Sequence, residues 1–225
     1  MQESRQRPPR SDSHLADSAT RQLATSLNNL GLLLASSQAL EEAESAYGES
    51  IDLLRNFEGP TGGAATSDDP EIGHQLAAVL SNLAGLLVQR SPERSVNLVR
   101  EAIAKQSSIL ESDPTNTRLA SQAISTLNTL GAAQLADGQL AEAVSTFRQS
   151  IRMTDKFLAR WPDQTTHVRD QVVAHNQLGL TLAKMGELSE SEKSFVSALR
   201  FSHDLTLHFP SDAEVQSMHG NVLNN

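Results

Sequence analysis

A five-residue phrase recurs four times along this chain with the same internal spacing. Each copy ends in Leu-Gly or Leu-Ala, and the copies occupy residues 27–31, 80–84, 127–131 and 175–179. A repeat of this regularity is typical of stacked helix pairs, in which each unit buries its apolar face against its neighbour. The sequence therefore predicts an all-α repeat protein and argues against a globule with a single core.

Prolines set the period of the repeat. Pro114, Pro162 and Pro210 follow one another at intervals of 48 residues. After allowance for the turns, each unit has room for two helices of about 20 residues, each about 30 Å long at 1.5 Å per residue. In the first unit we expect a first helix from His14 to Ser37 and a second from Ala39 to Phe57.

These signals divide the chain into seven segments. We expect a disordered N-terminal arm, because Pro8, Pro9 and their polar neighbours show no apolar periodicity. A glycine-rich flexible loop separates the first two repeats, and the first helix of the second repeat should end near Arg90. The expected boundaries are 1–13 for the arm, 14–58 for repeat 1, 59–69 for the loop, 70–112, 113–160 and 161–209 for repeats 2 to 4, and 210–225 for a half repeat or capping helix.

Small side chains at matched positions would let the two helices of a unit approach closely. We call the last residue of each phrase the register residue; these are Gly31, Ala84, Gly131 and Gly179. Each is expected to face a small residue on the second helix, namely Ala43, Ser95, Ala143 or Ser191. A bulky residue four positions later should fill the space between neighbouring pairs, and these are Tyr47, Val99, Phe147 and Phe195. A second small residue three positions beyond should make room for the next first helix; these are Ser50, Ala102, Ser150 and Ala198. Gly138 and Gly186 fall where a left-handed cap is needed.

This pattern resembles the tetratricopeptide repeat. The third repeat carries it at Leu130, Gly131, Gly138, Ala143 and Phe147, and the fourth at Leu178, Gly179, Gly186, Phe195 and Ala198. The 48-residue period is similar to the long variety in kinesin light chains and in arrays attached to bacterial serine/threonine kinases. The resemblance implies a right-handed superhelical solenoid of antiparallel helix pairs, with four repeats and a terminal helix. It also implies a concave face, lined by the first helices, that binds extended peptides.

Amide side chains recur just before the register residues, three and two positions ahead of them. They can donate to and accept from a peptide backbone, so we expect them to bind it. An alternative remains open, in which these amides only hydrate the helix face or bond neighbouring helices to one another. The candidate peptide-binding residues are Asn28, Asn29, Asn82, Asn128, Asn176, Gln177, Asn224 and Asn225.

Composition excludes several other functions. The net charge of −9 disfavours nucleic acid and membrane surfaces, and the absence of cysteine excludes thiol chemistry and cysteine-ligated zinc. Residues 1–10 lack the apolar stretch of a secretion signal, so a cytoplasmic location is expected. The seven histidines form no metal-binding motif, and the glutamates near the start of second helices offset the helix dipole. We therefore expect no metal, no cofactor and no catalysis.

The sequence thus favours a non-catalytic scaffold that binds a peptide or a partner protein. A second hypothesis is self-association through the apolar stripe at Val215, Met218, Val222 and Leu223, or a structural role within a longer, kinase-linked signalling polypeptide. A Leu-Gly directly after Asn225 would mark the chain as a fragment. Trp161 and Phe209 are expected to fill seams between repeats, although Trp161 could instead anchor a partner.

Overall fold

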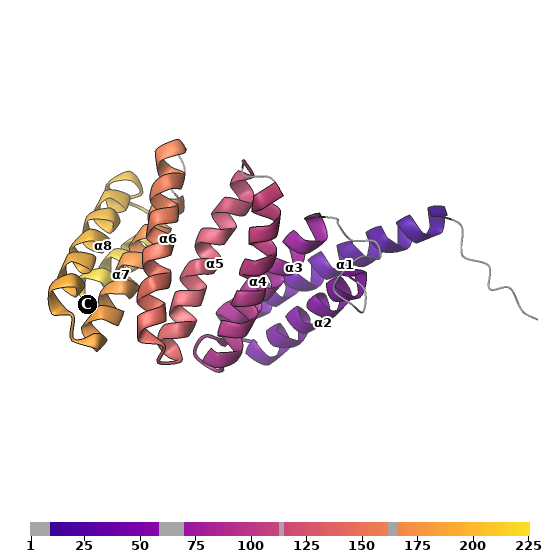
Figure 1. The fold of residues 1–225 in the computed structure, drawn as a ribbon, viewed down its shortest axis with the longest axis horizontal. Coiled ribbons are helices and arrows are strands. Elements are labelled where there is room, and N and C mark those ends of the chain that lie inside the picture. Colours follow the sequence, from indigo (N-terminus) through magenta and orange to yellow (C-terminus); the bar gives the residue numbers. More distant parts are fainter. Residues whose placement is uncertain (1–9, 59–69, 113–114, 162–165) are drawn as a thin grey trace, which may run out of the picture. The chain divides into compact units, whose positions relative to one another are not determined.

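The computed structural model describes residues 10–58, 70–112, 115–161 and 166–225, and helices make up nearly all of them (Figure 1). Across these described ranges there is no strand, and no helix is long and apolar enough to cross a membrane. The fold is an all-α solenoid built from neighbouring helix pairs, as predicted. The helices are α1 (Arg10–Ser36), α2 (Leu40–Glu58), α3 (Pro70–Leu87), α4 (Pro92–Ser112), α5 (Thr117–Ala136), α6 (Leu140–Arg160), α7 (Thr166–Met185), α8 (Leu188–His208) and α9 (Ala213–Leu223).

Most predicted helix boundaries lie within three residues of those observed. The exception is α1, which begins at Arg10, inside the arm predicted for residues 1–13. Pro8 and Pro9 come directly before it, and proline is tolerated only in the first turn of a helix, so the proline pair is the better boundary signal. Helix α3 ends at Leu87 and not at Arg90. The rest of the arm, the loop 59–69, Pro114 and Pro162 lie outside the described residues.

Contacts divide the chain into two compact units, residues 1–83 and 84–225, which are described separately. In the first unit α1 packs against α2. In the second unit each helix from α4 to α9 packs against the next one, and α5 also contacts α7. The starts of α6 and α8, Leu140 and Leu188, are 48 residues apart, which is the predicted period.

Three register glycines pack against an aromatic ring of their own repeat. A Cβ atom added to Gly131 would lie 2.5 Å from Cε1 of Phe147. The corresponding distances are 2.6 Å from Gly31 to Tyr47 and 2.7 Å from Gly179 to Phe195. The prediction that these rings fill the space between repeats was therefore incomplete, because each ring lies directly over the glycine of its own pair.

The second repeat replaces both members of this contact. Ala84 stands in place of glycine and Val99 in place of the aromatic residue, and both belong to one buried cluster. The extra methyl group on the first helix is thus matched by a smaller side chain on the second. The predicted contact of small residues also occurs, since Oγ of Ser95 donates to the carbonyl of Ala84 and Oγ of Ser191 to that of Gly179, both at 2.8 Å.

The later small positions of the second helix are fully buried, and two of them bond to the first helix of the same repeat. Oγ of Ser50 donates to the carbonyl oxygen of Ala24 at 2.7 Å. Oγ of Ser150 donates to Oδ1 of Asn128 at 2.6 Å. In these two repeats a hydroxyl therefore fastens the helix pair, a role that the sequence interpretation missed.

The turn glycines adopt the predicted left-handed conformation. Gly138 has a φ of +79° and Gly186 a φ of +83°. Gln38, in the corresponding turn of the first repeat, has a φ of 66° although it is not glycine. Its side chain gives no sequence signal for this conformation, so the prediction missed it.

Helix α9 buries most of the apolar stripe that suggested self-association. Val215 and Val222 join a buried cluster with Val172 of α7 and with Ala198 and Leu205 of α8, and Met218 packs against it. Of the four stripe residues only Leu223 is largely exposed. Most of the C-terminal stripe is therefore used within the chain, and self-association through α9 stays an untested hypothesis.

The two aromatic residues before the linker prolines cap their helices. Phe209 is the C-cap of α8 and packs against the same cluster. Trp161 is the C-cap of α6, and its ring centroid lies 4.7 Å from that of Phe157. Phe157 in turn meets His167 of α7 at 4.3 Å. Both aromatic residues thus lie beside contacts between successive helices.

Candidate functional site

Two amides of the first unit bond to each other across successive repeats. Nδ2 of Asn82 on α3 donates to Oδ1 of Asn28 on α1 at 2.9 Å, and both side chains are half-buried. Asn29, the next residue along α1, is exposed. The first unit therefore joins two of the predicted residues in a bond between first helices.

The same bond recurs at the other end of the chain. Nδ2 of Asn225 donates to Oδ1 of Asn176 at 3.0 Å. In both pairs the acceptor lies three positions before a register residue and the donor two positions before the next, with Asn225 placed by extrapolation. This recurrence supports the inter-helix role that the sequence left open. An amide offers two donors and two acceptor lone pairs, so one such bond leaves capacity for a ligand.

The side chain of Asn128 is buried and forms its hydrogen bonds inside the protein. Its Oδ1 accepts from Ser150, and its Nδ2 donates to the carbonyl of Asp170 at 3.3 Å. Its two bonds join α5 to α6 and to α7. We assign it a structural contribution, in contrast to the more exposed amides at the surface.

The remaining predicted residues lie near the end of the chain. Gln177 is half-buried on α7 beside Asn176, whereas Asn224 is exposed and forms the C-cap of α9. The backbone N–H of Asn224 donates to the carbonyls of Gly220 and Val222. Asn176 and Gln177 thus lie on α7, and Asn225, which follows the C-cap of α9, bonds to Asn176.

A pocket of about 350 Å³ lies between α7 and α9, the first helices of successive repeats. The sequence predicted Asn176 and Gln177 as binding residues and placed Met218 and Val222 in an apolar stripe, but it did not bring these residues together in one pocket. The pocket is lined by Val172, Val173, Asn176 and Gln177 of α7 and by Glu214, Ser217, Met218, Asn221 and Val222 of α9.

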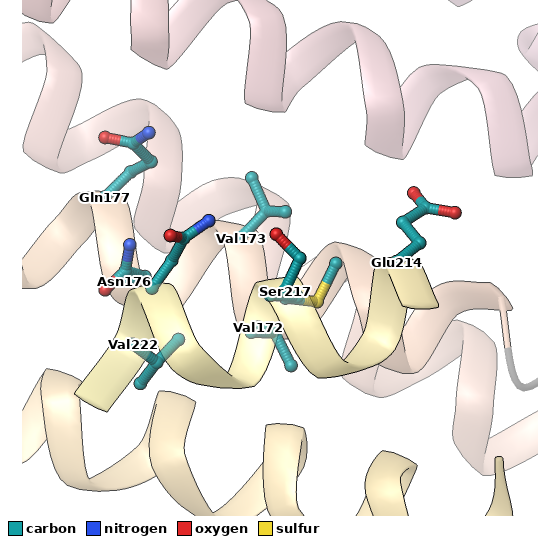
Figure 2. A pocket seen from close by; sticks show the side chains of 9 residues that line it. Val172, Val173, Asn176, Gln177, Glu214, Ser217 and Val222 are labelled. Carbon is teal, nitrogen blue, oxygen red and sulfur yellow. The ribbon is translucent and has the colours of Figure 1, made fainter. Parts of the chain in front are cut away.

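The pocket combines an apolar floor with a polar rim. In Figure 2 the side chains of Gln177, Val173 and Glu214 project to one side of the two helices, whereas Val172 and Val222 point to the other, toward the buried cluster. Val173 is 38% exposed, so an apolar surface reaches solvent there. This mixture of apolar contact area and convergent polar groups is typical of ligand pockets.

An ion-pair group holds α9 against α7 at one end of the pocket. Arg169 of α7 donates to Glu214 at 2.7 Å and also to Asp212, which is the N-cap of α9. The backbone N–H of Val215 is the largest cause that lowers the pKa of Asp212, and Arg169 lowers it further. The Glu214 carboxylate that lines the pocket is therefore already paired with the guanidinium of Arg169.

A second pocket, of about 510 Å³, lies in the first unit between α1 and α3. It differs from the α7–α9 pocket because its entire lining is polar: Ser18, Arg21, Gln22, Thr25, Ser26 and Gln75. Because no apolar side chain lines it, it offers less to an apolar anchor, so the α7–α9 pocket is the stronger candidate.

The part of the chain that the structure describes holds no group of three or more metal-ligating side chains. The early glutamates behave as expected for dipole partners, since Glu41 and Glu42 lie in the first turn of α2 and Glu190 in that of α8. Lys184 is exposed in the last turn of α7.

One segment of the chain matches a known family of repeats. Residues 23–60, which include the second half of α1 and all of α2, match the tetratricopeptide repeat family model. A search of curated proteins found no significant match.

Two solved structures resemble the chain only weakly. The de novo designed helical repeat protein DHR64 has 17% sequence identity and a TM-score of 0.41, with coverage of 96% of this chain and 99% of that chain. The double mutant MamA RS-1 ArsTM has 15% identity and a TM-score of 0.32, with coverage of 84% and 97%. Scores this low support no inference, so the fold assignment rests on the helix pairs themselves.

Proposed function

We propose that this protein is a non-catalytic scaffold that binds an extended segment of a partner protein along its first helices. The observation that carries the proposal is the α7–α9 pocket, which has apolar walls and an amide rim on the face where the sequence predicted binding. Its volume of about 350 Å³ is at the lower end of the range for ligand sites. That size suits one or two side chains of a peptide.

The pocket chemistry favours a peptide with an aliphatic anchor. Val173 and Met218 present apolar surface that a Leu, Ile or Met side chain of the partner would cover. Asn176 and Gln177 stand at the rim, where they can bond the backbone amides on either side of that anchor. Backbone bonds provide affinity with little sequence preference, and the apolar anchor provides the selectivity.

We also propose that the repeats belong to the long-period variety, on the basis of the 48-residue spacing of α6 and α8. The cytoplasmic location expected from the sequence is part of the same proposal. Neither statement is needed for the peptide-binding experiment.

The proposal is tested by selecting peptides from a random displayed library on the full chain and measuring their affinity by fluorescence anisotropy. Val173→Asp should abolish binding, because it places a carboxylate on the apolar wall beside Glu214. Val173 is partly exposed, so the variant should fold normally, as checked by circular dichroism.

Leu207→Asp is the matched control, since Leu207 is 66% exposed on α8, outside the pocket. It should leave the affinity unchanged. Equal affinity of the Val173→Asp variant and the unmodified chain for every selected peptide would refute the pocket as the binding site.

A further inference from the structure

Helix α1 exposes leucines at positions that later repeats bury. Leu23, Leu30 and Leu33 are 52%, 45% and 66% exposed. Leu23 lies eight positions before the register residue Gly31, Leu30 lies one position before it, and Leu33 lies two positions after it. The corresponding residues of α5 are Ala123, Leu130 and Ala133, and those of α7 are Gln171, Leu178 and Thr181; all six are at most 8% exposed.

The second helix of the preceding repeat covers these positions in later repeats. Leu130 and Ala133 of α5 form a cluster with Val96 and Val99 of α4. Leu178 of α7 clusters likewise with residues of α6. Among the described residues no repeat precedes α1, so its leucine face lacks this cover.

We propose that this face of α1 is the interface of a symmetric dimer of the chain. The exposed Leu23 and Leu30 alternate with the half-buried Leu27 and Leu34 at intervals of four, three and four residues, the spacing by which two helices pack leucines against each other. No charged residue occurs from Gln22 to Leu40. Two chains that each carry a net charge of −9 therefore meet with least repulsion along this stretch.

A head-to-tail arrangement fits the structure less well. In such an arrangement the second helix of a repeat in one chain would cover α1 of another chain. That helix would need a free face on the side that normally packs against the first helix of the next repeat. The inner face of α8 is occupied, because Ala198 and Leu205 pack against Val215 and Val222 of α9. Those of α4 and α6 are covered by α5 and α7. The α1 face of a second copy is available and self-complementary, which gives a closed twofold pair.

Sedimentation equilibrium of the full chain tests this proposal. The unmodified 24.3 kDa chain should reach twice that mass as its concentration rises. The double variant Leu23→Glu, Leu30→Glu should raise the dimer dissociation constant at least about 30-fold, the effect of losing an interface hot spot. Both leucines are exposed in the monomer, and glutamate is a good helix former, so the helix content should stay the same.

The control variant carries Leu188→Glu and Leu207→Glu, which alter leucines of α8 that are 70% and 66% exposed. It should dimerise like the unmodified chain. The proposal is overturned by a chain that stays monomeric at all concentrations. It is equally overturned if the α1 variant dimerises normally, or if both double variants weaken the dimer to the same extent. The outcome does not depend on the peptide-binding assay, because that assay measures affinity at the pocket between α7 and α9 and not association through α1.

Discussion

Replacing Gly131 by alanine tests the close contact between a register glycine and the aromatic ring of its repeat. The added Cβ would lie 2.5 Å from Cε1, 2.7 Å from Cζ and 2.8 Å from Cδ1 of Phe147. Contacts under 3.0 Å are not tolerated, so the ring or a helix must move. Phe147 is fully buried, so its ring does not border on solvent.

The magnitude follows from two opposing terms. Alanine stabilises a helix interior relative to glycine by about 1 kcal/mol. Overpacking of a dense core costs about 1 to 3 kcal/mol. We therefore expect Gly131→Ala to reduce the free energy of unfolding by about 1 kcal/mol, with a larger loss for Gly131→Leu.

The second repeat supplies the compensating change, since it pairs Ala84 with Val99. Phe147→Val alone should lower the free energy of unfolding by about 2 to 3 kcal/mol, because it leaves a cavity. In the Phe147→Val background, however, the clash is gone and Gly131→Ala should stabilise the chain by up to about 1 kcal/mol. The effect of the same substitution is thus expected to change sign.

Urea denaturation followed by far-UV circular dichroism measures all four members of this double-mutant cycle, with the slope of each transition compared. Gly48→Ala is the control, because a Cβ atom at Gly48 in α2 would meet nothing within 4 Å. It should stabilise the chain by about 0.5 to 1 kcal/mol. If Gly131→Ala had the same effect with phenylalanine and with valine at position 147, the reasoning would be refuted.

Three further predictions concern single residues. Gln38→Gly should raise the free energy of unfolding by about 1 kcal/mol, because φ at this position is 66°; a loss of stability in urea denaturation would contradict this. Asn128→Ala should lower the free energy of unfolding by about 1 to 3 kcal/mol, because it leaves buried groups without their hydrogen-bond partner, and it should not change the affinity for selected peptides. Asn176→Ala should weaken that affinity. The reverse result would make Asn128 a binding residue. Burial lowers the pKa of His175 below its ordinary value of 6.5; the charge of Asp155 opposes this shift and that of Arg200 adds to it. The folded state therefore binds the proton less well than the unfolded state, so the free energy of unfolding falls as the pH drops below about 6.5. His175→Leu should make the free energy of unfolding less dependent on pH in this range. An unchanged difference in unfolding free energy between pH 7.5 and pH 5, as rough settings either side of that value, would exclude this role.

The repeat register could be predicted from the sequence because it depends on side-chain size at fixed intervals. The small residues at positions 31, 84, 131 and 179 are local signals, and Gly138 and Gly186 confirm that a turn glycine reports a left-handed conformation. Gln38 adopts the same conformation, but glutamine is not a residue type that signals it, so the sequence gave no warning.

The site was harder to predict because its polar groups are distributed by tertiary contacts. Asn128 and Asn176 occupy the same register position, yet one is buried and bonded to Ser150 and the other lines a pocket. The difference comes from their neighbours: α7 packs beside α5, whereas the short α9 lies beside α7. A pattern along one helix does not contain that information.

The most direct test of peptide binding between α7 and α9 is methyl NMR of the full chain titrated with a selected peptide. The account predicts that the methyl signals of Val173 and Met218, which line the pocket, shift as the peptide saturates the protein. The signals of Val196, 60% exposed on α8 and outside the pocket, should not move. Shifts at Val196 without shifts at Val173 and Met218 would contradict the account.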